Sequence, residues 1–229
     1  MAVQLVKLHN EPDLVDRVYR VLLDAICDGT LAAGARITQE EIAEQLAVSR
    51  QPVLQALRLL KQDRFVLDAP GRGVLVAPLD ADSVVHLYQV RVALDARAVR
   101  LAAARRACLD PGLIERGRKA ARGKSVKAMI DADLAFHDAI YAASGNPWIE
   151  QSAHHHWRHL RRVMGAVLQQ SRGRATVWDE HEAIAAAIAA GNGARAERLA
   201  ADHGRRASEN LAAQLAQMLS DKRLQGDRR

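Results

Sequence analysis

The first part of the chain alternates apolar and polar residues with the period of an α-helix. Between residues 14 and 28 the apolar side chains recur at steps of three and four, and a glycine follows as a stop signal. Thr38 and Glu41 have the spacing of a capping box, in which each side chain satisfies a free backbone N–H at a helix start. A third helix is predicted from Ser49, a favourable N-cap, to about Gln62. Two short helices with a tight connection indicate a helix-turn-helix.

Two short β-prone segments follow the third helix. Residues 65–67 and 74–76 are each a run of three apolar residues, and the segment between them contains a proline and two glycines. Such a connection suits the tip of a β-hairpin. A hairpin directly after a helix-turn-helix is the wing of a winged helix-turn-helix, so we predict a DNA-binding domain of this type at residues 10–78.

Residues 79–220 contain alanine-rich amphipathic segments and few strand signals, which predicts an all-helical domain. Glycines and prolines divide it into about six helices, one of them with Asn146 as its N-cap. We expect these helices near residues 83–107, 112–122, 125–143, 147–170, 175–190 and 194–219. Residues 221–229 are polar and are predicted to form a disordered tail. The expected fold class is therefore mainly α, with a small β-hairpin wing and a C-terminal helical bundle.

Composition agrees with helix packing and adds little about partners. Aromatic residues make up only 3% of the chain, while 49% of residues are hydrophobic. The formal net charge of +6 suits a polyanionic partner, but residues 1–78 carry 9 Lys and Arg against 10 Asp and Glu. The DNA hypothesis therefore depends on local pattern.

Cysteine usage and hydropathy indicate the cellular compartment in which the protein is expected. Cys27 and Cys108 fit no CxxC pattern, which argues against a disulfide framework or a thiolate zinc site. The N-terminal residues lack the apolar stretch of a signal peptide, and no run of about 18 apolar residues occurs. We expect a soluble, cytoplasmic protein with no membrane partner.

Arg50 and Gln51 lie at the start of the second helix of the predicted pair. In winged helix-turn-helix proteins this helix enters the major groove, and the wing approaches the backbone or the minor groove. A lone exposed arginine is usually only solvated. The ordered series of capping box, turn, helix and hairpin is what points to DNA. Further candidate contacts on this helix are Ser49, Gln55 and Arg58.

Residues 12–78 resemble the GntR family of regulators. The resemblance is carried by Gly29-Thr-Leu-Ala-Ala-Gly-Ala-Arg-Ile37, Glu41-Ile-Ala-Glu-Gln-Leu-Ala-Val-Ser-Arg50, Pro52-Val53 and Ala56-Leu57. It implies a double-stranded DNA operator as partner, contacted by Arg36, Arg50, Arg72 and Gly73. Where the family usually has Val-Arg-Glu-Ala-Leu, this chain has Leu54 at the position of the family's base-reading arginine. The operator sequence typical of the family therefore does not carry over.

Four residues of the helical part are candidates to share a divalent metal ion. Asp133 and His137 are four residues apart and project from one helix face, and His181 and His203 lie on two later helices joined by a Gly-Asn-Gly turn. Neutral imidazoles and a carboxylate suit zinc foremost, with nickel, manganese or iron as alternatives. Taken singly, each histidine is more often an ordinary surface or core residue. An alternative ligand pair is His155 and His159.

The same residues resemble the C-terminal domain of the FadR-like (FCD) branch of the GntR family, and the six helices resemble its VanR-type subgroup. In that branch Asp-x-x-x-His and two later histidines supply a metal site. The matching stretches are Asp133-Leu-Ala-Phe-His137, Glu180-His181-Glu-Ala-Ile184, Asp202-His203, Ser144-Gly-Asn146 and residues 88–103. The resemblance implies that Arg91 holds an organic carboxylate through paired N–H donors, with Asn146 at the same effector site. An ion pair with Asp95 is the alternative role of Arg91.

The combined prediction is a homodimeric, metabolite-responsive transcriptional repressor that binds a pseudo-palindromic operator and a small organic carboxylate. Two rivals remain open. A metal-dependent enzyme would use the same Asp and His set to activate water, but the sequence offers no obvious general base, nucleophile or cofactor loop. A DNA-binding regulator with a structural or absent metal would instead take an apolar, acyl-type effector.

Overall fold

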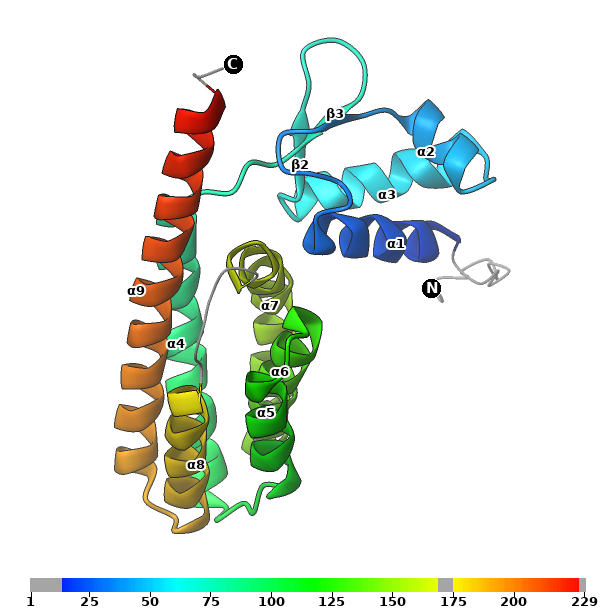
Figure 1. Ribbon diagram of the computed structural model, residues 1–229. Helices are drawn as coiled ribbons and strands as arrows, with labels where there is room; N and C mark the ends of the chain where they lie inside the picture. Colours follow the sequence, from blue (N-terminus) through cyan, green and yellow to red (C-terminus); the bar gives the residue numbers. More distant parts are fainter. Residues whose placement is uncertain (1–13, 169–174, 227–229) are drawn as a thin grey trace, which may run out of the picture. The chain divides into compact units, whose positions relative to one another are not determined.

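The computed structural model describes residues 14–168 and 175–226, and the chain divides into two compact units, Met1–Pro78 and Leu79–Arg229 (Figure 1). Each unit buries its own cluster of apolar side chains. Three helices and a small sheet form the first unit, and six helices form the second within the described residues. The predicted fold class, a winged helix-turn-helix followed by an all-helical bundle, is confirmed.

The N-terminal unit packs its helices and its sheet around one core. Its elements are α1 (Leu14–Asp28), β1 (Arg36–Ile37), α2 (Gln39–Gln45), α3 (Arg50–Gln62), β2 (Val66–Asp68) and β3 (Val74–Val76). The sheet is antiparallel with the order β1-β3-β2, so that Leu75 pairs with Arg36 on one side and with Leu67 on the other. Val53, Leu60 and other apolar side chains of α3 face this core, as the helical period predicts.

Local capping explains where the helix-turn-helix begins and turns. Thr38 Oγ1 accepts a hydrogen bond from Glu41 N at 3.3 Å, and Glu41 Oε2 accepts one from Thr38 N at 3.0 Å, so the predicted capping box is present. Ser49 occupies the N-cap position of α3, but its side chain makes no capping hydrogen bond. Its predicted position at the N-cap is confirmed.

The wing differs from the predicted hairpin in two details. A third strand, β1, adds two residues to the sheet, and sequence patterns do not indicate it because its pairing with β3 is distant along the chain. The first hairpin strand covers Val66–Asp68 and not residues 65–67, and the fully buried side chain of Phe65 lies in the core. The predicted second strand, β3, has the expected bounds.

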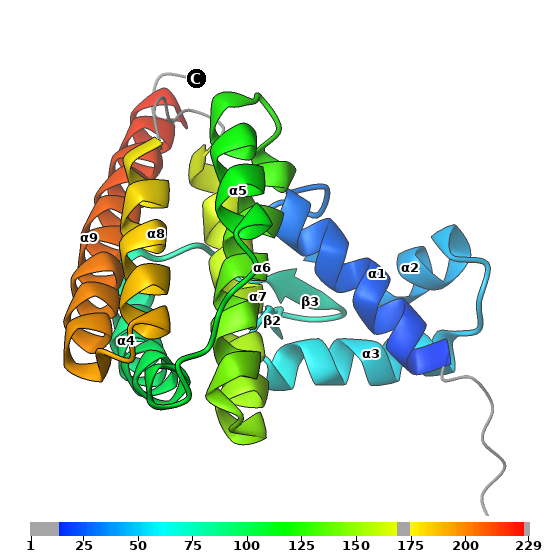
Figure 2. The ribbon, with the colours of Figure 1, turned by 90° about the horizontal axis from the view of Figure 1, so that it is seen from below.

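The C-terminal unit is a bundle in which α4, α8 and α9 lie along one side and α5, α6 and α7 along the other (Figures 1 and 2). Its elements are α4 (Ala81–Ala104), α5 (Gly112–Arg122), α6 (Val126–Ser144), α7 (Pro147–Val167), α8 (Ala175–Ala189) and α9 (Gly193–Gly226). The long helices α4 and α9 approach closely, since a Cβ added at Gly204 of α9 would lie only 2.5 Å from Val92 Cγ2 of α4.

Several predicted helix ends shift. Helix α4 begins at Ala81 because Asp80 caps it, its carboxylate accepting a hydrogen bond from Ser83 N at 2.8 Å. The predicted disordered tail at 221–229 is corrected: α9 continues through Gly226, supported by a 2.8 Å hydrogen bond between Gln217 and Asp221 one turn apart. The rest of that tail, 227–229, and residues 169–170 of the predicted fourth bundle helix lie outside the described residues.

No helix within 14–168 or 175–226 combines the length and the hydropathy that crossing a membrane requires.

Candidate functional sites

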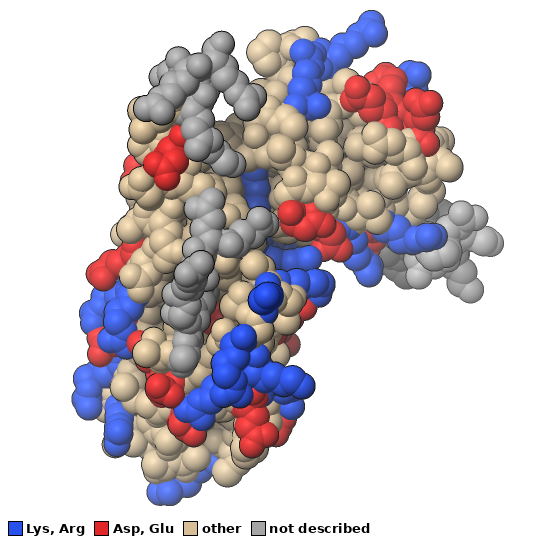
Figure 3. All heavy atoms as spheres, viewed as in Figure 1, with Lys and Arg blue, Asp and Glu red and all other residues tan. Residues whose placement is uncertain are grey.

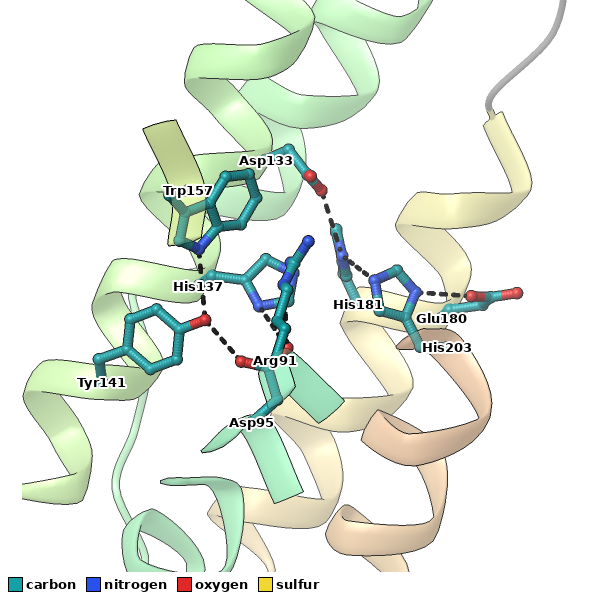
Figure 4. A network of polar contacts seen from close by, with 9 residues as sticks. All are labelled: Arg91, Asp95, Asp133, His137, Tyr141, Trp157, Glu180, His181 and His203. Carbon is teal, nitrogen blue, oxygen red and sulfur yellow. Dashed lines mark hydrogen bonds and ion pairs between the residues drawn. The ribbon is translucent and has the colours of Figure 1, made fainter. Parts of the chain in front are cut away.

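Three histidines converge in the interior of the helical unit (Figure 4). His137 comes from α6, His181 from α8 and His203 from α9, and their exposed fractions are 3%, 0% and 5%. One ring nitrogen of each lies within 4.8 Å of the other two, a spacing that a single metal ion could span. In the described part of the chain, these three histidines form a group whose ligand atoms are close enough to share one metal ion.

Two carboxylates flank the histidines. Asp133 Oδ1 lies 3.5 Å from His181 Nε2, which is itself 3.3 Å from His203 Nε2. On the other side of its ring, His203 Nδ1 lies 2.8 Å from Glu180 Oε2. A proton on Nδ1 donated to Glu180 leaves the Nε2 lone pair of His203 facing the centre of the group. The four residues predicted as ligands therefore lie together, and Glu180 is a neighbour to which the sequence analysis gave no role.

Burial sets the protonation of two of the rings. Desolvation, with the positive charge of Arg91 next in weight, holds the pKa of His137 well below its ordinary value of 6.5. Desolvation and the neighbouring His203 lower the pKa of His181 in the same way. Both rings are neutral near pH 7, the form in which imidazole binds a metal.

The donor set fits a divalent cation. Both ring nitrogens of His137 and Nδ1 of His181 are buried without a hydrogen-bond partner, and unsatisfied buried polar atoms are costly. Converging neutral imidazoles with one carboxylate match the preferences of zinc and related ions. A bound cation would therefore satisfy buried ring nitrogens that lack a hydrogen-bond partner among the described residues.

Arg91 and Asp95 form a buried ion pair beside the histidines. Arg91 Nε lies 3.2 Å from Asp95 Oδ2, and its guanidinium carbon is 4.0 Å from the centroid of the Trp157 ring. Tyr141 donates its hydroxyl to Asp95 Oδ1 at 2.5 Å, while Asp95 Oδ2 is 3.6 Å from His137 Nδ1. Asp95 therefore touches the arginine and a histidine at once. The ion pair predicted as the alternative role of Arg91 is therefore present. Effector binding by Arg91 stays a prediction.

Other candidates from the sequence have different surroundings. Asn146 caps α7, its Oδ1 accepting a hydrogen bond from Trp148 N at 3.1 Å, so its effector role also stays a prediction. The rings of His155 and His159 have centroids 5.8 Å apart, but within 14–168 and 175–226 they join no group of three or more candidate ligands. The alternative ligand pair thus has less support than the buried group.

In the N-terminal unit, a hollow lies between α2, α3 and the wing. Its lining includes four basic side chains, Arg50, Arg58, Lys61 and Arg72, together with Leu54. Arg50, Leu54 and Arg58 follow one another at steps of four and so share one face of α3. Gln51 and Gln55 of α3 are also exposed. In Figure 3 basic side chains stand at the loop between β2 and β3, and acidic ones gather over α2.

The predicted DNA-contact residues play unequal parts in shaping this surface. Arg36 Nε donates a hydrogen bond to the backbone oxygen of Arg72 at 2.9 Å and so fixes the wing tip. Gly73 has φ +89°, and a Cβ there would collide with the backbone oxygen of Ile37. Arg50 keeps 68% of its side chain exposed and makes an exposed ion pair with Glu40, at 3.3 Å. Contact of these residues with DNA stays a prediction.

A winged helix-turn-helix followed by an all-helical unit with a buried polar centre defines a DNA-binding transcriptional regulator. Residues 14–76 match the family of bacterial regulatory proteins called the gntR family, and residues 86–206 match the FCD domain. The chain belongs to the GntR family of transcriptional regulators, and its C-terminal unit is an FCD domain.

Similar proteins agree with this assignment. The HTH-type transcriptional regulator LutR of Bacillus subtilis is 30% identical over 205 residues, which cover 75% of this chain and 89% of LutR. The uncharacterized regulator YdhC of the same organism is 34% identical over 83 residues, 36% of this chain and 37% of YdhC. A solved putative GntR regulator from Rhodococcus sp. RHA1 superposes with a TM-score of 0.70 at 26% identity, covering 87% of this chain and 97% of that one.

Coverage of the relatives is uneven. The chain spans 37–55% of the length of three curated relatives, one of which is YdhC. The matched families and relatives are those of transcriptional regulators and not of enzymes, so the metal-dependent enzyme hypothesis is not supported.

Proposed function

We propose that this regulator is a homodimeric, metabolite-responsive repressor that binds a pseudo-palindromic operator and responds to a small organic carboxylate at a metal site in its FCD domain. The observation that carries the proposal is the convergence of His137, His181 and His203, with Asp133 beside them, in the core of that domain. Membership of the VanR-type subgroup belongs to the same proposal.

The four converging residues would hold the ion, with zinc as the first candidate. When bound, the ion would supply a Lewis-acidic centre that attracts a carboxylate oxygen. Glu180 fixes the ring of His203, and Arg91 adds a positive charge beside the site. Because the ligands come from α6, α8 and α9, effector binding favours one packing of these helices over another and shifts the population of DNA-binding states.

On the DNA side, α3 enters the major groove. Arg50 and Gln51 stand at its exposed N-terminal end, where base edges are reached, and Arg72 of the wing meets phosphates. Arg36 and Gly73 hold the wing in shape for that contact. A two-fold dimer places two such helices on two half-sites, which is the reason for a pseudo-palindromic operator.

Replacement of one ligand tests the sensor. His181→Ala should lose the metal and the effector response while keeping most operator binding, because the winged helix-turn-helix has a separate core. Metal content of protein purified without a His-tag, and operator binding by fluorescence anisotropy with and without candidate acids, measure the two effects. His154→Ala is the matched control, since its partially exposed ring pairs with Asp138.

The outcome separates three cases. Stoichiometric metal and a normal response in His181→Ala would show that His181 is not a ligand and would favour His155 and His159. Outright unfolding of the helical unit would show that the metal is mainly structural. Loss of metal and response with a folded protein supports the sensor proposal.

A further inference from the structure

The charges that line the hollow between α2, α3 and the wing favour a polyanion. The lining has four basic side chains, Arg50, Arg58, Lys61 and Arg72. Against these stand the two carboxylates of Glu40 and Asp68, whose ion pairs are exposed. Exposed ion pairs are weak, so the phosphate backbone of DNA can compete for the basic side chains.

Leu54 differs from the other apolar side chains of this lining. Leu57 and Val74 also border the hollow, but both pack in the core of the N-terminal unit. Leu54 is half-buried and belongs neither to that core nor to the partly buried side chains packed against it. It lies one turn after Arg50 and one turn before Arg58, in the middle of the face that these arginines share. An apolar side chain thus stands on a basic surface where the core does not require it.

The major groove of DNA offers one prominent apolar feature to such a side chain. Every base pair presents hydrogen-bond donors and acceptors there, and thymine adds a methyl group at C5. Leucine forms no side-chain hydrogen bond, so against a G·C pair it would leave polar edge atoms desolvated and unpaired. Against thymine it buries a methyl group, which favours binding about fourfold.

We propose that Leu54 is a specificity-determining residue that reads the 5-methyl group of a thymine in the major groove. The inference rests on the proposed function, in which α3 enters that groove, and deepens it by naming a base. The flanking Arg50 and Arg58 hold the helix on the DNA and so set the register at which Leu54 meets the bases. The operator should therefore have a thymine at one fixed position of each half-site.

Exchange of thymine for uracil isolates the methyl group, because uracil keeps every hydrogen-bonding group of thymine. Operator sequences are first selected from random duplexes with the full-length wild-type protein. Deoxyuridine then replaces thymidine at one position at a time, and fluorescence anisotropy at fixed salt gives the dissociation constant of each duplex. We expect about fourfold weaker binding when the thymine that Leu54 contacts is exchanged.

Variants then assign this methyl contact to Leu54. Leu54→Ala and Leu54→Gln should bind the thymine and uracil duplexes with equal affinity, because the first side chain is too short and the second ends in a polar amide. Leu54→Met keeps an apolar side chain of similar volume and should retain most of the difference. Leu59→Ala is the matched control, since Leu59 is an exposed leucine of the same helix outside the lining of the hollow, and it should keep the full difference.

The results distinguish this inference from the function on which it rests. Failure to enrich any sequence overturns the proposed operator binding and the inference with it. A selected operator that the wild-type protein binds equally well with uracil at every thymine overturns the inference alone, whether or not the variants fold. A fourfold difference that persists in folded Leu54→Ala or Leu54→Gln assigns the methyl contact to another residue and also overturns the inference.

Discussion

At the scale of single residues, the bond between Glu180 and His203 decides which ring nitrogen faces the histidine group. The hydrogen bond from His203 is the largest cause that lowers the pKa of Glu180, and Arg206 lowers it further. Glu180 therefore stays a carboxylate and a strong acceptor. A neighbouring carboxylate that orients a histidine in this way raises the basicity of its free nitrogen.

Glu180→Gln is expected to weaken zinc binding about 10- to 100-fold, because an amide orients the imidazole less firmly than a carboxylate does. Competition with a chromophoric chelator measures the zinc affinity. Glu182→Gln, on the same helix and paired with Arg118 at 2.9 Å, is the control and should bind zinc like the wild type. Equal zinc affinity in all three proteins would show that Glu180 does not support the site.

At the scale of secondary-structure elements, α3 carries the exposed face on which operator binding should depend. Arg50→Ala should weaken operator binding by about 1–3 kcal/mol, the range for a good arginine contact with a base. Fold and core should be unaffected, since 68% of the Arg50 side chain is exposed. Anisotropy titrations at fixed salt give the affinity, and an unchanged value would remove Arg50 from the interface.

Arg72 in the wing provides a contrasting substitution. Arg72→Ala should cost less affinity than Arg50→Ala and lower the slope of log affinity against log salt by about one, as loss of one phosphate contact does. Titrations at several salt concentrations measure that slope. A loss confined to particular base substitutions in the operator would instead mean that the wing reads sequence.

The helices of both units could be predicted because their signals are local: caps, glycine stops and apolar stripes lie within each element. Strand β1 could not, since two residues such as Arg36 and Ile37 have no period and their partner lies in β3. The spacing of Arg91 and Asp95 indicates their ion pair. The contacts of Asp95 with Tyr141, and of Glu180 with its histidine, could not be predicted, because they depend on which faces of separate helices meet.

At the scale of the whole molecule, each unit has its own core and therefore its own free energy of unfolding. Among the residues that the structure describes, the buried histidines lie in the Leu79–Arg229 unit, so acid should weaken that unit selectively. All three tryptophans of the chain also lie there, at positions 148, 157 and 178. Tryptophan fluorescence therefore follows the unfolding of this unit without contribution from the DNA-binding unit.

In the metal-free protein, the urea midpoint measured by tryptophan fluorescence should fall as the pH drops below about 6.5, the ordinary histidine pKa. The unfolded chain then takes up protons at His137 and His181, whose lowered pKa keeps them neutral when folded. Each contributes a loss of up to about 1.4 kcal/mol per pH unit, and the stability is fully present above that pH.

A pair of variants checks the cause of this pH dependence. His137→Gln/His181→Gln should flatten the fall in the urea midpoint, whereas His154→Gln, a substitution of a partly exposed histidine, should preserve it. An identical slope in the double variant and the wild type would place the acid-sensitive groups elsewhere.

The bond from Arg36 to the wing tip has an evolutionary consequence. Its acceptor is the backbone oxygen of residue 72, an atom that every amino acid possesses. Mutations can therefore exchange the side chain at this position without costing the wing the anchor that shapes it. Single mutations at residue 72 can therefore change how strongly the wing attracts the phosphate backbone of any operator. The shape of the wing is kept, and the strength of its contact with DNA is open to selection.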